Sequence, residues 1–329
     1  MNPISSNFVN PVLTNLSVGW QQNPEGFVAN VVFPVVGVQI QGGVYYEFSR
    51  ADFNRNLMKV RGPSEESAGG GFRLTNNPYF CNVRALHKDL DQQTLANFPL
   101  LNLEQSATRF LTNQALINRE VDWAAHYFVT GIWGTTMTGV SAAPVGTQFL
   151  QWNNGASTPI EDLRAGIRGV QLAAGGYKPN TAVFGKQVWD QLVDHPDVVD
   201  RIKGAAGPGN PAIVTRAAFA SLIEVERVLV MEAVQNTALE NSAGINSLET
   251  NAFIGGTNAL VCYSAPAPGV EQPSAGYTFE WTGYNGGAAT AVSSWWEQKV
   301  KSQRVEIETA FDQRLTSAVL GYFFLTAVA

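Results

Sequence analysis

The stretch from Leu103 to Phe128 constrains the fold of this 329-residue chain more than any other. Apolar side chains recur there at three- and four-residue spacings, which predicts a helix with one stripe facing a core. The stripe comprises Leu103, Ala107, Phe110, Leu111, Ile117, Val121, Ala124, Ala125 and Phe128, interrupted by Gln114. Off the stripe fall Glu104, Arg109, Asn113, Asn118 and Glu120. Asn102 followed by Gln105 predicts the start and Gly131 the end of a helix about 39 Å long, a beam across a domain.

Composition narrows the function classes. Hydrophobic residues make up 45% of the chain and charged residues 15%, against roughly a quarter in a typical soluble domain. Together with many Gly, Asn, Gln and Thr residues, this indicates that something other than water covers much of the surface. The net charge of −6 provides no basic surface for nucleic acid. Cys81 and Cys262 are isolated on apolar strands, so we expect small core residues and neither a disulfide nor a zinc site.

Neither end of the sequence resembles a targeting or membrane segment. The start MNPISSNFVN lacks a basic stretch followed by an apolar one, which argues against a secretory signal and for folding in the cytosol. The apolar run from Leu315 to Ala329 is shorter than the roughly 20 residues that a membrane helix needs. We expect a strand buried on both faces there.

The first third of the chain has little capacity to form its own core. Residues 1–33 read as an arm with isolated apolar anchors (Phe8, Val12, Leu16, Trp20 and Phe27) and no core within the chain. Val35 to Ile40 and Val44 to Phe48 predict a hairpin, with Val44, Tyr46 and Phe48 on one face. A mixed-charge, glycine-rich stretch follows, up to residue 71. So long an excursion predicts packing on a neighbouring subunit.

The remainder predicts an α/β unit followed by strands. Residues 132–156 read as a loop-rich connection, and Thr158 with Pro159 predicts a capped helix start. Ile160, Leu163, Ile167, Val170 and Ala174 predict the buried stripe of that helix, and further helices and strands follow as far as residue 285. Val305, Ile307, Thr309 and Phe311 alternate with charged residues in a half-exposed strand. The apolar C-terminal strand is expected to complete the sheet under the long helix.

Candidate catalytic groups are few. His87, His126 and His195 are the three histidines, and His195 lies in the loop Asp194-His195-Pro196-Asp197. That loop could hold a metal or acid–base site, but no other ligand stands at a suitable spacing, which favours a capped turn before a short helix. Nucleophile-elbow, phosphate-loop and zinc-helix motifs are absent. Trp295-Trp296 could stack a sugar or base, although packing at a domain or subunit junction is the simpler interpretation. We therefore predict no catalytic, cofactor or metal residues and no enzyme.

This order of segments resembles the major capsid proteins of tailed bacteriophages, a fold shared with encapsulin shells. The segment TPIEDLRAGIRGVQLAAGGYKPNTAVFGKQVWDQL is similar to the opening of that family's axial domain. The resemblance implies an α+β, Hong Kong 97-type fold. Its parts would be an N-terminal arm (1–33), an extended loop (34–87), a peripheral domain with the long helix as its spine (88–156), an axial domain (157–285) and closing strands of the peripheral domain (286–329).

The resemblance also implies a function and partners. The chain would form hexamers and pentamers of an icosahedral shell around double-stranded DNA, in the virion, after assembly in the host cytoplasm. A separate scaffolding protein, a portal and a decoration protein are the implied partners, with only weak, non-specific contact to DNA. An encapsulin-like compartment shell is the alternative. Some relatives link a loop lysine to an asparagine of the next subunit; Lys59 lies in the matching region, but nothing identifies its acceptor, so we do not expect the link.

Overall fold

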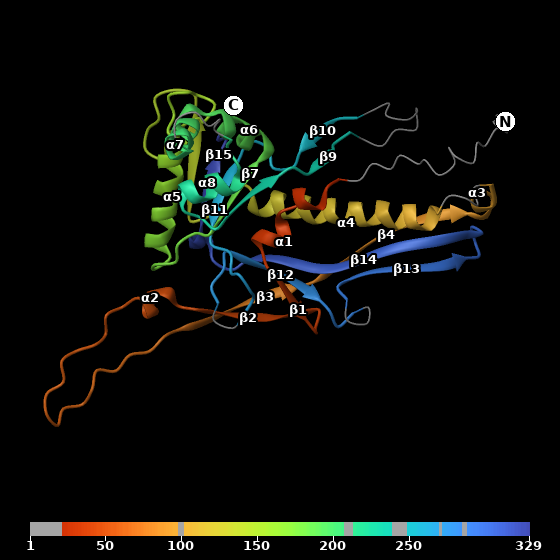
Figure 1. Cartoon of the computed structure of the whole chain (residues 1–329). Coiled ribbons are helices and arrows are strands. Elements are labelled where there is room, and N and C mark those ends of the chain that lie inside the picture. The colour runs from red at the N-terminus through yellow and green to blue at the C-terminus, as the bar shows by residue number, and fades with distance from the viewer. Residues whose placement is uncertain (1–21, 98–101, 207–212, 239–248, 270–271, 285–287) are drawn as a thin grey trace.

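The computed structural model describes residues 22–97, 102–206, 213–238, 249–269, 272–284 and 288–329. It has two lobes and a long projecting loop (Figure 1). One lobe is an elongated sheet covered by a single long helix, and the other is an α/β unit near one end of that helix. The architecture is therefore α+β, as predicted.

The elongated lobe is built on β14, the longest strand. Its sheet has the order β1-β12-β14-β13, and β4 also pairs with β14. The strands are β1 (Val35–Val38), β4 (Asn82–Asp91), β12 (Gly276–Trp281), β13 (Thr290–Glu297) and β14 (Ser302–Leu315). Among the described strands of this sheet, β1 and β12 pair in parallel and the other pairs are antiparallel. Val305, Ile307 and Phe311 of β14 are buried, which confirms the predicted alternation.

The long helix lies on this sheet. Helix α4 (Leu103–Tyr127) follows the short α3 (Gln92–Asn97), and the Asn102 side chain accepts a hydrogen bond from the Gln105 backbone N at 3.0 Å, as the predicted start requires. Ala107 and Leu111 pack against Val305 and Ile307 of β14. The predicted stripe is wrong at Phe110, which is 47% exposed, and at Ala125, which is exposed as well. Asn113 and Glu120 were expected off the stripe, but both side chains are buried.

The second lobe has a six-stranded sheet in the order β6-β5-β15-β11-β7-β8. Its strands are β5 (Thr135–Val140), β6 (Gln148–Leu150), β7 (Thr181–Gly185), β8 (Arg227–Met231), β11 (Ala259–Cys262) and β15 (Gly321–Leu325). Its helices are α5 (Pro159–Ala173), α6 (Lys186–Asp194), α7 (Pro196–Ala206) and α8 (Arg216–Ile223), and β9 (Val234–Asn236) and β10 (Asn251–Phe253) form a separate hairpin. The predicted core positions of α5 are buried, although Thr158 makes no side-chain cap.

Residues 22–33, which we call the strap, cross the junction of the two lobes. The strap contains η1 (Pro24–Gly26) and α1 (Ala29–Val32). Val28, Val32 and Phe33 are buried in one cluster with Trp123 and Phe128 of the α4 end. The prediction that residues 1–33 have no core within the chain is therefore wrong for the strap. The anchors expected at Phe8, Val12, Leu16 and Trp20 lie outside the described residues.

Three strand assignments differ from the expectation. Residues 35–40 and 44–48 do not form a hairpin: β1 pairs with β12, and β2 (Gly42–Phe48) pairs with β3 (Leu74–Phe80). The C-terminal strand β15 does not lie under α4 but between β5 and β11 of the other sheet, after the short turn η3 (Ala318–Leu320). Residues 135–150, expected as loop, supply β5 and β6.

The chain therefore passes repeatedly between the lobes. Strand β12 lies in the elongated sheet although it belongs to the stretch 157–285 that was expected to be a separate unit. Strand β15 lies in the sheet of the α/β lobe, where both of its faces are buried. Phe324 packs with the helices of its lobe and Phe323 with the strap and the α4 end.

Candidate subunit interface

The projecting loop exposes one apolar face. β2 and β3 form a two-stranded antiparallel ribbon, registered from Gly42 opposite Phe80 to Phe48 opposite Leu74. Opposed residues share a face, so Val44, Tyr46 and Phe48 lie together, as predicted. Val44 is 50%, Tyr46 63% and Leu74 51% exposed. We call this side of the ribbon the free face.

The opposite face fixes the ribbon to the elongated sheet. Tyr45 and Tyr79 stack on Phe279 of β12, with ring centroids 5.4 Å and 4.5 Å away. The Tyr45 hydroxyl also donates a hydrogen bond to the Leu315 carbonyl at 3.3 Å. The ribbon is thus held in a definite orientation that leaves the free face without cover from its own chain.

A small aromatic cluster continues the free face beyond the ribbon. Phe48, Phe53 of α2 (Arg50–Phe53) and Phe72 lie with ring centroids 5.3–6.0 Å apart. Arg73 and Asp52 form an ion pair at 3.0 Å beside them, and the hydrogen bond from Arg73 lowers the pKa of Asp52 to about 2. Phe53 and Phe72 remain 62% and 60% exposed. A contiguous exposed apolar patch of this kind is typical of an interaction surface.

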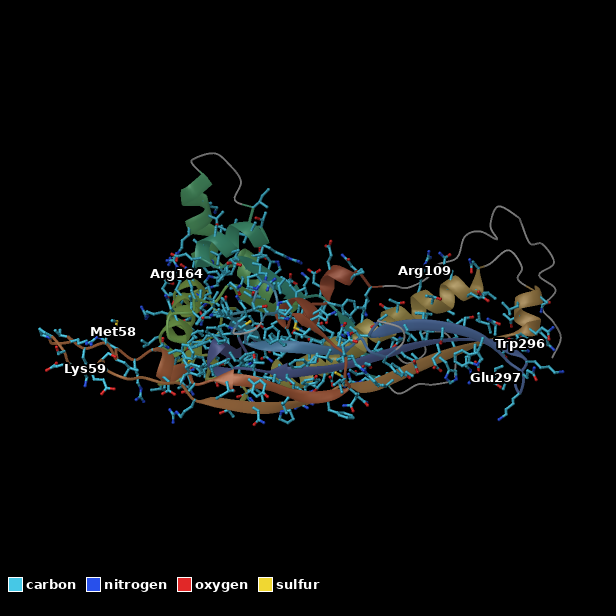
Figure 2. The ribbon with its side chains drawn as sticks, turned by 90° about the horizontal axis from the view of Figure 1, so that it is seen from below. Met58, Lys59, Arg109, Arg164, Trp296 and Glu297 are labelled. Carbon is cyan, nitrogen blue, oxygen red and sulfur yellow. The ribbon has the colours of Figure 1, made fainter. Side chains whose placement is uncertain are left out.

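The loop tip carries three further exposed apolar side chains. Leu57, Met58 and Val60 are 43%, 90% and 101% exposed. Met58 and Lys59 lie at one end of the molecule, whereas Trp296 and Glu297 lie at the other (Figure 2). The tip therefore cannot reach the far end of its own elongated lobe. Among the residues that the structure describes, no asparagine contacts Lys59.

The far end of the elongated lobe is a second exposed region. Trp295 and Trp296 of β13 are 37% and 44% exposed, so they do not pack at a junction between the lobes of one chain. Among the described strands β13 pairs with β14 alone, which leaves its outer edge open. An open edge strand with aromatic side chains is a surface on which other chains can pack.

The loop is also fixed to the α/β lobe. Asn54, directly after α2, lies so close to Gly175 at the end of α5 that an added Cβ there would overlap the Asn54 side chain. Gly175 has φ +74°, a conformation that favours glycine. The sequence predicted Gly175 as a helix end but not this contact, because nothing local links residues 54 and 175.

His195 is buried and holds a turn of the backbone. His195 is 3% exposed; its Nδ1 accepts a hydrogen bond from the Asp197 backbone N at 3.2 Å, and its Nε2 lies 3.0 Å from Ser157 Oγ. The ring thus holds the start of α7, which confirms the capped turn. Ser157 is equally buried and no substrate could reach it. In the part of the chain that the structure describes, no three His, Cys, Asp or Glu side chains gather as metal ligands, and no helix is long and apolar enough to span a membrane.

Glu120 is a buried polar residue that the sequence reasoning missed. It is 1% exposed, and its carboxylate accepts hydrogen bonds from the backbone N–H groups of Val28 and Ala29. It stands off the apolar stripe because α4 is buried on two sides at this point, by the sheet and by the strap. No local signal in the sequence reveals the second side.

Comparisons with known proteins agree with this architecture. No protein-family model matches the chain. The chain is 25% identical over 323 residues to the major capsid protein of Pseudomonas phage JBD67, covering 98% of this chain and 97% of that protein. It is also 25% identical over 283 residues to the major capsid protein of Burkholderia phage BcepMu, covering 82% of each. A subunit of the bacteriophage PhiM1 mature capsid has the same fold, with a TM-score of 0.59 and 15% identity over 96% of this chain and 91% of that one.

Proposed function

We propose that this chain, a structural phage major capsid protein with the Hong Kong 97-type fold, assembles as hexamers and pentamers into an icosahedral shell enclosing double-stranded DNA. The observation that supports the mode of assembly is the projecting loop with its uncovered apolar face. Packing that face on a second copy would bury apolar surface at about 25 cal/mol per Å². A single chain does not gain this stabilisation, since its own residues leave the free face exposed and the tip of the loop projects beyond both lobes (Figure 1).

An encapsulin-like compartment is less favoured, because both sequence relatives are phage major capsid proteins. The parts of the chain are proposed to act as an arm (1–33), extended loop (34–87), peripheral domain (88–156 and 286–329) and axial domain (157–285), with β5, β6 and β15 contributed to the axial sheet. The protein is proposed to have a structural role and to be located in the virion.

Further partners belong to the proposal. A separate scaffolding protein would guide closure in the host cytoplasm, a portal would occupy one vertex, and a decoration protein could bind outside. Contact with DNA is expected to be weak, because 27 acidic residues outnumber 21 basic ones and the two kinds are interspersed. Containment of DNA would then depend on contacts between subunits.

The experiment replaces the apolar side chains of the tip without changing the length of the loop. Leu57, Met58 and Val60 are changed together to Ser, and Glu66→Ser in the same loop is the matched control. All four side chains are exposed, so the unassembled subunit should melt at an unchanged temperature. Assembly, followed by sedimentation and electron microscopy, should fall sharply for the triple variant and remain normal for the control.

Two results would contradict the proposal. Normal particles from the triple variant would show that the tip makes no stabilising contact. Normal particles from a deletion of residues 62–71 would show that assembly does not depend on this part of the loop.

A further inference from the structure

The strap is attached to α4 through a buried carboxylate. Glu120 Oε2 lies 3.0 Å from Val28 N and 2.9 Å from Ala29 N, and Oε1 lies 3.0 Å from Val28 N. These two N–H groups stand at the start of α1. The side chain is almost completely shielded from water. Burying a carboxylate is costly unless a cation or several donors compensate.

No cation compensates Glu120 among the residues that the structure describes. The charged groups that the surrounding elements carry include Arg119 and its partner Glu280, Asp122 and its partner Arg84, Arg227, Glu232 with its partner Arg216, and Glu25. Arg119 lies 2.7 Å from Glu280 and donates to Asn30, while Arg227 donates to Thr181 and to the Val31 carbonyl. Glu232 pairs with Arg216 at 2.6 Å. The two backbone donors are therefore the compensation that the structure shows.

The geometry accommodates a neutral carboxyl without loss of either donor. Oε2 alone accepts from both Val28 and Ala29, so a proton on Oε1 sacrifices only the second, shared contact to Val28. Protonation would thus remove a buried charge and keep the contacts that hold the strap. When the strap lifts, water reaches Glu120 and the ionised form regains its hydration.

We propose that Glu120 makes the docking of the strap on α4 dependent on pH, with the strap held more firmly in acid and released more readily as pH rises toward neutrality. Burial raises the pKa of Glu120 to about 7 from its ordinary 4.5. A carboxyl whose pKa is raised in the docked state stabilises docking below its ordinary pKa, and this stabilisation is lost as pH rises to the docked value. The inference concerns a single chain and does not depend on shell assembly.

Hydrogen exchange of the unassembled full-length subunit tests this. Protection factors, corrected for the intrinsic pH dependence of exchange, are measured for peptides covering residues 27–33 between pH 5 and pH 8. From the two pKa values the opening equilibrium should increase on the order of 50-fold over this range. The corrected protection of α6, whose buried side chains belong to the core cluster of the α/β lobe and not to the cluster of the strap, should stay constant and serves as the internal reference.

Glu120→Gln is the matched variant, because its amide is neutral at every pH and its oxygen can accept from the same donors. We expect it to keep the strap highly protected at pH 8 and to abolish the pH dependence. A wild-type strap whose protection does not change relative to α6 would overturn the inference, as would a Gln variant with an unchanged pH profile. If the Gln variant does not fold, the pH profile of the wild-type strap still tests the inference by itself.

Discussion

Phe33→Ala should destabilise the unassembled subunit, because the strap belongs to the core of its own chain. Phe33 is fully buried, and its ring lies 4.9–6.5 Å from the rings of Tyr127, Trp123 and Trp133. It also packs so tightly against Gly276 that an added Cβ on the glycine would overlap the ring. The side chain thus joins the strap, the α4 end and β12.

The magnitude follows from this packing. Replacing a buried Phe by Ala typically costs 3–5 kcal/mol, a range that includes the loss of aromatic contacts such as these. We therefore expect a loss of about 4 kcal/mol in the free energy of unfolding. For a chain of this size that corresponds to a melting temperature lower by about 6 °C.

The assay compares Phe33→Ala with Phe72→Ala by thermal unfolding monitored by circular dichroism, followed by assembly. Phe72 is 60% exposed on the projecting loop. We expect Phe72→Ala to leave the melting temperature nearly unchanged and to impair assembly. The reasoning would be refuted if Phe33→Ala left the subunit's melting temperature unchanged and blocked assembly instead, since the strap would then pack on a neighbour.

Two further predictions concern the thiols and the loop attachment. Burial raises the pKa of Cys81 to about 11 and of Cys262 to about 12, so neither should react with a thiol reagent at pH 8 until guanidinium unfolds the chain, when both should react. Fast reaction of the folded protein would contradict this. Gly175→Ala should lower the free energy of unfolding by at least about 1 kcal/mol through the positive φ and the overlap with Asn54. Adding Asn54→Ala should restore only the part of the lost stability that comes from the overlap of the new Cβ with the Asn54 side chain. The two single variants and the double variant are compared by chemical denaturation, and strictly additive losses would count against the contact.

Local sequence pattern predicted the elements that local physics determines. The spacing of apolar residues and the Asn102 cap located α4, and the alternation of Val305, Ile307 and Phe311 located β14. The shared face of Val44 and Tyr46 followed from the period of a strand. In each case the signal lies within a few residues of the structure that it determines.

Long-range pairing was not predictable in the same way. The apolar sequence of β15 would suit a buried strand of either sheet, so it does not reveal that the partners of β15 are β5 and β11. Val35 to Val38 lie close in sequence to β2 but pair with β12, more than two hundred residues away. The burial of Glu120 likewise depends on the strap, whose place over α4 is fixed by contacts distant in sequence. The sequence predicted that Val44, Tyr46 and Phe48 share a face that packs on a neighbouring subunit. That Leu74 of β3 lies on the same face follows only from the strand pairing in the structure.

Cryo-electron microscopy of the assembled protein tests the central claim most directly. The account predicts a closed icosahedral shell of hexamers and pentamers, in which the free face of each β2–β3 ribbon and the side chains of Leu57, Met58 and Val60 are covered by a neighbouring copy. A shell in which these side chains face solvent, or a protein that remains monomeric under assembly conditions, would contradict it.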